Sequence, residues 1–198
     1  MKYSQPAFYH FNEDSIHLVN YVIEDSIKML LSKDKPLKIL DLCCGCGVVG
    51  IELYLKVSKE KVEIHKIDFL EINSSFEEHL LKNQQMFQNK KVNYQNYFCD
   101  LLKFEAEQKY DLIVSNPPYY SSRNFRPSQN HDRNIARTYE EGFMKNFLSF
   151  IANNLKPEGK AYFLGLSENS DIHKSSYKIE REKELSSEVS LFSLLSSE

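Results

Sequence analysis

The residues most suggestive of chemistry form the tetrapeptide Asn116-Pro117-Pro118-Tyr119, which follows the apolar run Leu112-Ile113-Val114. Two consecutive prolines end a strand, because neither has an N–H group for the ladder. They also stiffen the backbone behind Asn116, and Tyr119 places a flat ring beside its amide. An amide oxygen, a rigid carbonyl group and an aromatic ring together suit a planar ligand that carries an exocyclic amino group.

The chemistry that this corner suits is transfer of a group to a poorly nucleophilic amine. The lone pair of an exocyclic amine on a purine is delocalised into the ring. Two acceptors on its N–H groups would orient the amine and take up the positive charge that develops. We predict that the Asn116 side-chain oxygen and the Pro117 carbonyl are those acceptors, and that Tyr119 stacks on the base. Such a base must leave its own stack or already lie in a loop.

A glycine-rich turn is the second group of candidate residues. Gly45-x-Gly47-x-x-Gly50 follows the apolar segment 37–42 and matches a dinucleotide-binding fingerprint literally. Gly45 and Gly47 allow positive φ and close approach of a ligand to the backbone. Asp41 changes the interpretation, because a carboxylate just before the glycines would repel a pyrophosphate but attract a cationic ligand.

The elements that must position these residues alternate between strands and helices. This spacing predicts an α/β fold: a doubly wound, mostly parallel sheet flanked by helices, with a C-terminal antiparallel hairpin. Ligands of such sheets bind beyond the carboxyl ends of the strands, so the turn and the tetrapeptide should face one crevice. The predicted strands are 37–42, 62–70, 92–98, 111–115 and 160–166, the helices 15–31, 48–57, 73–89 and 140–155, the hairpin 177–185 with 189–194, and the loops 33–38 and 119–138.

Composition narrows the classes of partner. A chain of 198 residues is about one domain long, and its net charge of −3 gives no global basic field for non-specific binding of nucleic acid. No window is apolar enough to span a membrane, and the N-terminus lacks a signal-peptide core, so we expect a cytoplasmic protein with no membrane partner. The four cysteines lack the paired spacing of a zinc site, and we predict no metal; they are Cys43, Cys44, Cys46 and Cys99.

Residues 41–50 resemble the cofactor motif of class I, Rossmann-like S-adenosylmethionine-dependent methyltransferases, and residues 116–119 resemble the catalytic motif of the amino-methyltransferases among them. The resemblance implies S-adenosylmethionine as cofactor, which carries an ammonium and a sulfonium but no phosphate. Cys43 departs from the motif, where the family commonly has glycine. The resemblance divides the chain into an N-terminal helical extension, residues 1–36, and a methyltransferase domain, residues 37–198.

The resemblance also assigns residues to the cofactor. An acidic residue at the end of the second strand binds the ribose hydroxyls in this family, and both Asp68 and Glu71 are candidates. We prefer Glu71, which stands where the apolar strand gives way to a helix start; otherwise its carboxylate would interact with the helix dipole. Asp100 matches the position that meets the adenine amino group, or else caps a turn. The predicted cofactor residues are Asp41, Cys43, Gly45, Gly47, Glu71, Asp100 and Asn116.

Two further stretches resemble the bacterial tRNA adenine-N6 methyltransferases that modify the purine beside the anticodon of a valine tRNA. These are Gln5-Pro6-x-x-Tyr9-x-Phe11-x-x-Asp14-Ser15 and His131-Asp132-Arg133-x-x-Ala136-Arg137. Adenine N6 in tRNA is therefore the predicted target. The alternatives are bases of rRNA or DNA, a release-factor glutamine, or a non-catalytic Rossmann-like RNA-binding protein.

The predicted loop after the tetrapeptide concentrates arginines among aromatic residues. Such a mixture suits phosphates and unstacked bases of single-stranded RNA, so we predict RNA, in particular tRNA, as partner. A solvated loop in which the arginines pair with acidic neighbours is the alternative, and a protein partner is left open. The predicted substrate-binding residues are Pro118, Arg123, Arg126, Arg133 and Arg137.

Overall fold

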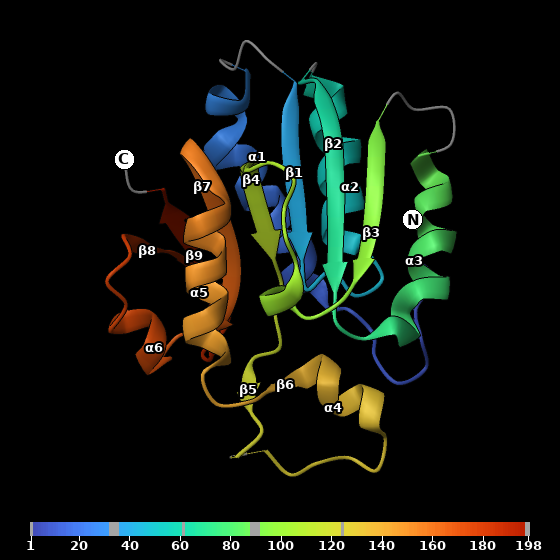
Figure 1. The fold of residues 1–198 in the computed structure, drawn as a ribbon, viewed down its shortest axis with the longest axis vertical. Coiled ribbons are helices and arrows are strands. Elements are labelled where there is room, and N and C mark those ends of the chain that lie inside the picture. Colours follow the sequence, from blue (N-terminus) through green and yellow to red (C-terminus); the bar gives the residue numbers. More distant parts are fainter. Residues whose placement is uncertain (1, 32–35, 61, 88–91, 124, 197–198) are drawn as a thin grey trace.

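The computed structural model describes residues 2–31, 36–60, 62–87, 92–123 and 125–196. Within them, seven strands form one sheet in the order β3-β2-β1-β4-β7-β9-β8 (Figure 1). The strands from β3 to β7 in that order pair in parallel, and β9 pairs antiparallel with β7 and β8, which confirms the predicted fold class. Their bounds are β1 Leu37–Leu42, β2 Ile64–Glu71, β3 Asn93–Phe98, β4 Tyr110–Ser115, β7 Leu155–Leu166, β8 Ile179–Glu184 and β9 Val189–Leu195.

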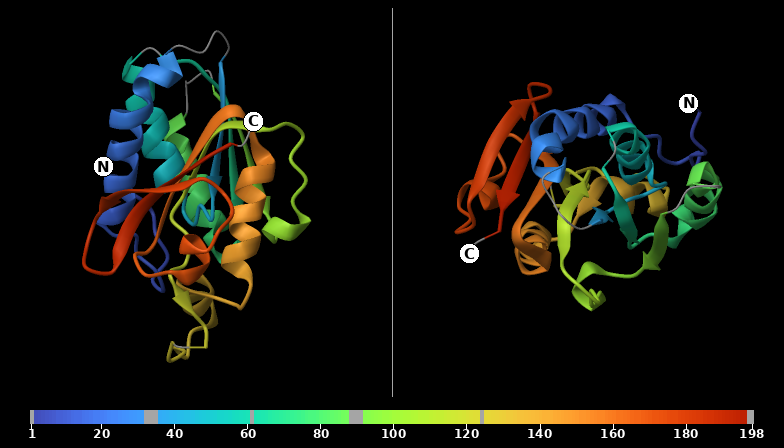
Figure 2. Two further views of the ribbon diagram at one scale, coloured as in Figure 1. Left: turned by 90° about the vertical axis from the view of Figure 1, so that its left-hand side faces the viewer. Right: turned by 90° about the horizontal axis from the view of Figure 1, so that it is seen from above.

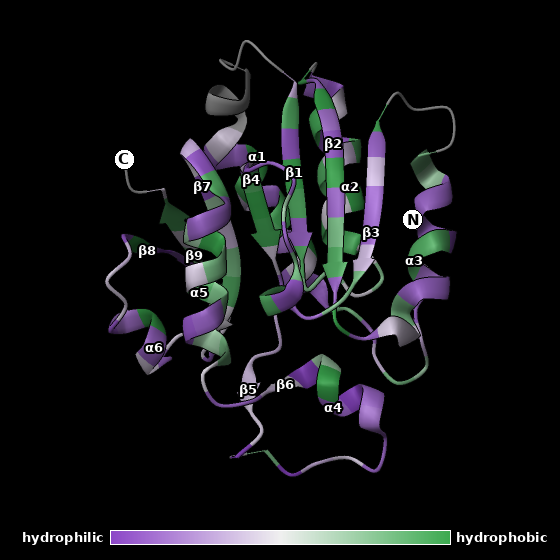
Figure 3. Ribbon diagram, in the orientation of Figure 1, coloured by the Kyte–Doolittle hydropathy of each residue, from purple (hydrophilic) through white to green (hydrophobic). Residues whose placement is uncertain are grey.

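Helices cover both faces of the sheet (Figure 2). On one face, α1 (Glu13–Leu31), α2 (Val48–Val57) and α3 (Glu77–Gln84) pack on one hydrophobic cluster. On the other face, α5 (Phe143–Asn154) and α6 (Ser170–His173) pack on a second cluster. The central strands are correspondingly apolar (Figure 3). None of the described helices is long and apolar enough to cross a membrane.

The predicted loop at 119–138 is wrong in part. It contains β5 (Tyr120–Ser121), α4 (His131–Arg137) and β6 (Thr138–Tyr139), and β5 pairs in parallel with β6. None of the residues of α4 is buried. The helix therefore lacks the periodic apolar residues by which a helix is predicted from the sequence. The side chain of Asn130 caps it by accepting from the N–H of Arg133 at 2.8 Å. The described part of this segment, residues 119–123 and 125–142, lies beyond the carboxyl ends of the strands (Figure 1); we call it the segment 119–142.

Other boundaries differ less. The helix predicted at 140–155 begins only at Phe143, after Gly142 in a left-handed conformation, and β7 already begins at Leu155. The helix predicted at 73–89 consists of a 3-10 turn, Ser74–Phe76, then α3, then a 3-10 turn, Gln85–Phe87. Two more 3-10 turns are Ser58–Glu60 and Leu101–Lys103. Residues 88 and 89 of that helix and residues 33–35 of the loop predicted at 33–38 lie outside the described residues.

The segment ahead of α1 is held against α3 and the glycine-rich turn by one buried amide. Asn83 is 2% exposed; its Oδ1 accepts from the N–H of Ser4 at 2.7 Å, and its Nδ2 donates to the carbonyls of Ser4 and Cys46, both at 2.9 Å. Phe8 and Tyr9 then meet the ring of Phe76 edge-on. These contacts bring the N-terminal segment to the same end of the sheet as the tetrapeptide.

Candidate active site

Strand register brings the predicted site residues together at the carboxyl ends of three neighbouring strands. Leu42 of β1 pairs with Leu70 of β2 and with Ser115 of β4. The residues that follow, Cys43, Glu71 and Asn116, therefore lie side by side at this edge of the sheet. The Ser115 hydroxyl donates to the carbonyl of Leu42 at 2.6 Å and ties two of these ends together. The strand order reverses between β1 and β4, where doubly wound sheets bind their ligands.

The glycine-rich turn has three residues in the left-handed region. The φ angles are 57° at Cys43, 52° at Gly45 and 80° at Gly47. An added Cβ at Gly47 would stand 2.5 Å from Cδ1 of Leu80. Both this close contact and the positive φ angle favour glycine at this position. Cys43 adopts the same kind of conformation with a side chain, at a cost of about 1–2 kcal/mol.

Glu71 fastens the end of β2 to the glycine-rich turn. Its Oε2 accepts from the N–H of Gly45 and its Oε1 from the N–H of Asn73, both at 2.9 Å. Burial raises the pKa of Glu71, and these backbone N–H groups act in the opposite direction. Asp68, the other candidate, lies within β2; it accepts from the Tyr110 hydroxyl at 2.7 Å and pairs with Lys66 at 3.1 Å. Of the two carboxylates, Glu71 is the one beside the turn.

Asp41 lies beneath the turn. It is 0% exposed, and its Oδ2 accepts from the N–H of Gly50 at 2.8 Å, which holds the first turn of α2. Its Oδ1 is buried with no hydrogen-bond partner among the described residues. Burial raises the pKa of Asp41 to about 7, with the N–H of Gly50 opposing the shift and Glu71 adding to it. The unpartnered oxygen fits a cation or a donor near the turn.

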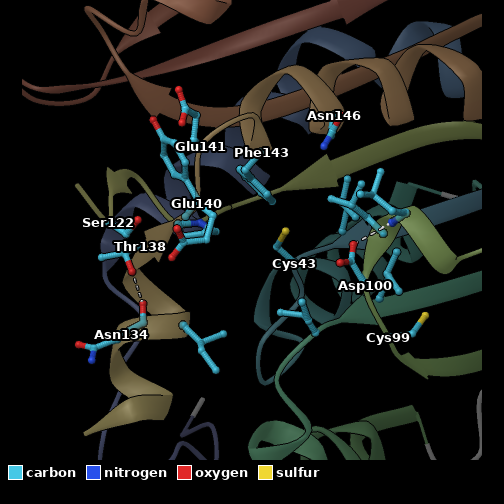
Figure 4. Close-up of a pocket in the computed structure, with 18 of the residues that line it drawn as sticks. Cys43, Cys99, Asp100, Ser122, Asn134, Thr138, Glu140, Glu141, Phe143 and Asn146 are labelled. Atoms are coloured by element: carbon cyan, nitrogen blue, oxygen red, sulfur yellow. Dashed lines mark hydrogen bonds between the residues drawn. The ribbon is translucent and has the colours of Figure 1, made fainter. Parts of the chain in front are cut away.

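A cavity of about 570 Å³ opens between the strand ends and the segment 119–142; we call it the Cys43 cavity (Figure 4). Cys43 and Asp100 line it from the sheet, and Asn134, Thr138 and Glu140 line it from the opposite side. Among its described lining residues there are carboxylates but no lysine or arginine. Its carboxylates can accept hydrogen bonds from hydroxyl and amino groups of a ligand.

Two exposed apolar side chains line the same cavity and were not predicted from the sequence. Ile72 is 58% and Leu102 is 66% exposed, and Asp100 lines the cavity with them; its side chain accepts from the N–H of Leu102 at 2.9 Å. Exposed apolar side chains of this size are suited to cover the faces of a flat ring. The sequence marks them only by position: Ile72 directly follows Glu71, and Leu102 stands two residues after Asp100.

A second cavity, of about 430 Å³, lies on the other side of the tetrapeptide; we call it the Asn116 cavity. Pro118 is the one described residue that lines both cavities. Arg133 and Arg137 line the Asn116 cavity, whereas Arg123 and Arg126 line neither, and Arg123 instead pairs with Glu141 on the surface. Aromatic residues complete the wall, namely Phe8, Tyr9, Tyr119 and Tyr120.

The side chain of Asn116 is hydrogen-bonded at both ends. The Tyr119 hydroxyl donates to Oδ1 at 2.6 Å, and Nδ2 donates to Oγ of Ser15 at 2.9 Å. Burial raises the pKa of Tyr119, with Asp14 adding to the shift, so its hydroxyl is protonated and donates. The oxygen of Asn116 is thus already held by a donor that an incoming amine could replace.

The model of the methyltransferase small domain family matches residues 24–139, which is more than half of the chain. The chain belongs to the methyltransferase small domain family. The match includes both the glycine-rich turn and the tetrapeptide of this methyltransferase small domain. It confirms the resemblance to S-adenosylmethionine-dependent methyltransferases that the sequence indicated.

Two curated relatives and one solved structure place this methyltransferase small domain further. A bifunctional methyltransferase of Rickettsia felis is 32% identical over 152 residues, 70% of this chain and 27% of that protein. A tRNA1(Val) (adenine(37)-N6)-methyltransferase of Actinobacillus pleuropneumoniae is 33% identical over 102 residues, 50% of this chain and 39% of that protein. The chain thus spans less than half the length of either relative. A Listeria monocytogenes protein assigned to the class I S-adenosylmethionine-dependent methyltransferases has a TM-score of 0.65 at 16% identity, over 98% of this chain and 63% of that one, and shares the fold.

S-adenosylmethionine is the cofactor of this methyltransferase fold, and the residues of the Cys43 cavity fit it. Ile72 and Leu102 suit the faces of its adenine, and Asp100 suits the adenine amino group. Glu71 and Asp41 are not among the described lining residues: both oxygens of Glu71 accept from backbone N–H groups, and Asp41 is buried beneath the turn. Their roles toward the ribose hydroxyls and the positive charge of the cofactor therefore stay predictions.

The backbone of Cys43 predicts an unusual response to glycine. We expect Cys43→Gly to leave the free energy of unfolding unchanged or to raise it by up to about 1 kcal/mol. Relief of left-handed strain, about 1–2 kcal/mol, exceeds or matches the added entropy of glycine in the unfolded chain, about 0.4–1 kcal/mol. Cys44 is buried in the same turn without positive φ, so Cys44→Gly should instead lower stability by about 1 kcal/mol or more. Urea denaturation measures both, and equal losses would contradict the strain.

Proposed function

We propose that this chain transfers a methyl group from S-adenosylmethionine to the N6 amino group of an adenine in tRNA. The observation that carries the proposal is the position of residues 116–119 between two cavities. The described lining of one has no lysine or arginine, and the other has two arginines and several aromatic rings. The likeness to a tRNA adenine-N6 methyltransferase supports the same substrate class.

The tetrapeptide orients the amine. When bound, S-adenosylmethionine supplies an electrophilic methyl group on a positively charged sulfur. The oxygen of Asn116 and the carbonyl of Pro117 accept the two N–H groups of the amine, and they stabilise the positive charge that develops on its nitrogen. When the amine binds, it replaces the Tyr119 hydroxyl as the hydrogen-bond donor to Oδ1 of Asn116, and the ring of Tyr119 then lies against the base. Holding the amine in line lowers the barrier by positioning alone.

The Asn116 cavity carries groups that suit RNA around the target base. Arg133 and Arg137 bring positive charge to its rim. Arg137 and Tyr120 line this cavity, and both contact Phe125, which lines the Cys43 cavity. The guanidinium of Arg137 lies 5.3 Å from the centre of the Phe125 ring, and Tyr120 stacks on that ring at a centroid distance of 5.3 Å. Guanidinium groups and stacked rings are the usual partners of phosphates and unpaired bases. Arg123 and Arg126 remain predictions for contacts outside the two cavities.

Incubation with radiolabelled S-adenosylmethionine tests the proposal. The protein is given total tRNA, rRNA, duplex DNA and release factor in parallel, and the labelled product is digested to nucleosides or amino acids. We expect N6-methyladenosine from tRNA. Methylguanosine from rRNA, or methylglutamine from release factor, would move the activity to an alternative substrate. If the protein binds S-adenosylmethionine by calorimetry and labels none of them, the catalytic proposal fails.

The two arginines of the Asn116 cavity should govern RNA affinity. We expect Arg133→Ala and Arg137→Ala each to weaken tRNA binding several-fold and to lower the slope of log affinity against log salt by about one, because each removes one phosphate contact. Arg181→Ala, on β8 and paired with Glu184, changes the net charge equally and is the control. Filter binding at several salt concentrations measures the affinity of all three variants. Equal slopes in the three would show that Arg133 and Arg137 do not contact phosphates and belong to a solvated loop.

A further inference from the structure

A buried serine from the first turn of α1 contacts the amide of Asn116. Ser15 is 2% exposed, and its Oγ accepts from Nδ2 of Asn116 at 2.9 Å, across 101 residues of chain. It lies outside the residues that the family model matches. A buried hydroxyl is costly unless it is hydrogen-bonded, so the contact accounts for a serine at a position packed inside the fold.

The two hydroxyl groups around Asn116 distinguish its oxygen from its nitrogen. The carboxamide is an acceptor at Oδ1 and a donor at Nδ2. A phenol is more acidic than an alkyl alcohol and is therefore the better donor and the poorer acceptor, so Tyr119 prefers the oxygen and Ser15 prefers the nitrogen. The observed pairing, 2.6 Å from Tyr119 to Oδ1 and 2.9 Å from Nδ2 to Ser15, follows this preference.

Only one orientation of that amide serves methyl transfer to an amine. The amine brings N–H groups, so it needs the oxygen of Asn116 and is opposed by its NH2 group. When the amine displaces the Tyr119 hydroxyl, that hydroxyl no longer orients the amide, and the contact with Ser15 is what remains. Without Ser15 the amide can rotate about its last side-chain bond, which is a soft torsion. Nδ2 of Asn116 would then face the nitrogen of the amine.

We propose that Ser15 is a positioning residue that keeps the oxygen of Asn116 directed at the amine during methyl transfer. The inference rests on the proposed function of Asn116 and adds a residue to it. Ser15 touches neither reacting group; it acts through Asn116. It also gives the N-terminal segment a part in the chemistry, since α1 delivers the hydroxyl.

Kinetics of three variants test the role. We expect Ser15→Ala to lower kcat about tenfold to a hundredfold, the size of loss that misplacing a reacting group causes, with KM for tRNA and Kd for S-adenosylmethionine within twofold. Ser15→Thr keeps a hydroxyl and should restore most of kcat. Alanine is a better helix former than serine, so α1 itself is not weakened. Ser26→Ala is the matched control: it is also on α1 and 2% exposed, and its hydroxyl bonds the Tyr162 hydroxyl instead.

Hydrogen exchange of the Asn116 side-chain amide gives a readout that needs no turnover. In protein labelled with 15N-asparagine, the resonance is assigned by its absence in Asn116→Ala. We expect slow exchange of the Nδ2 protons in the wild type, Ser15→Thr and Ser26→Ala, and at least tenfold faster exchange in Ser15→Ala.

The two readouts separate failure of this inference from failure of the proposed function. An active wild type with unchanged kcat in Ser15→Ala overturns the positioning role, as does unchanged amide exchange. A loss of kcat in Ser26→Ala equal to that in Ser15→Ala also overturns it, because the effect would then belong to helix packing. A wild type that methylates no substrate rejects the proposed function, while amide exchange still decides whether Ser15 orients Asn116.

Discussion

Asn116→Ala should reduce turnover by about a hundredfold or more while leaving the affinity for S-adenosylmethionine within about threefold. The loss follows because one of two acceptors on the amine disappears, and removing one preorganised group that stabilises developing charge costs about a hundredfold to a thousandfold in rate. Asn116 was predicted among the cofactor residues, but it lines the Asn116 cavity and not the Cys43 cavity, so cofactor affinity should survive. Single-turnover kinetics with tRNA and calorimetry with the cofactor measure the two effects.

Asn153→Ala is the control for Asn116→Ala, since Asn153 is an exposed asparagine on α5 whose Nδ2 donates to Oγ of Ser149 on the same helix at 3.4 Å. Its turnover should equal that of the wild type. A variant at Asn116 that loses cofactor affinity and turnover together, or that unfolds at lower urea concentration by more than the control, would show that Asn116 is a structural residue of the corner.

Glu71→Gln should weaken binding of S-adenosylmethionine about tenfold to a hundredfold and destabilise the fold by about 1–3 kcal/mol. Glutamine has one oxygen where the carboxylate has two, so the N–H of Gly45 or of Asn73 loses its acceptor inside the protein, and a buried donor left unpaired costs about that much. The end of β2 then no longer holds the glycine-rich turn, and an acceptor for the ribose hydroxyls disappears as well. Calorimetry and urea denaturation give the two quantities.

Asp68→Asn is the matched control because it is the other carboxylate that could bind the ribose. Its partners are Tyr110 and Lys66 rather than the turn. We expect a loss of stability in Asp68→Asn with cofactor affinity unchanged. The reverse result, with affinity lost in Asp68→Asn and kept in Glu71→Gln, would assign the ribose to Asp68.

Sequence reasoning was accurate where a local signal determines an element. The strand β1 and the helix α2 have the predicted bounds, because the glycine-rich turn ends one and begins the other, and the prolines after Ser115 end β4. The same signals identified the family. Register then does the rest: parallel pairing of three short strands places Cys43, Glu71 and Asn116 in a row.

What sequence reasoning missed depends on tertiary placement. α4 has a polar cap but no apolar stripe, so it reads as loop, and it becomes a helix against the Cys43 cavity and the β5–β6 pair. In the sequence, Ile72 and Leu102 look like core residues; the structure shows them exposed, in the lining of the Cys43 cavity. Ser15 contacts Asn116 because α1 lies alongside α2 and β7. The two residues are 101 positions apart, and no local sequence pattern predicts a contact between them.

The single proline between the two cavities has a consequence for chemical probes. Because Pro118 lines both the Cys43 cavity and the Asn116 cavity, a molecule with one part in each would need only a short connection past that ring. Joining two weak ligands turns the second binding step into an intramolecular one, and the gain is greatest when the linker just matches the span. On the proposed function, a bisubstrate inhibitor that joins a nucleoside to a planar base is the design that this arrangement suggests.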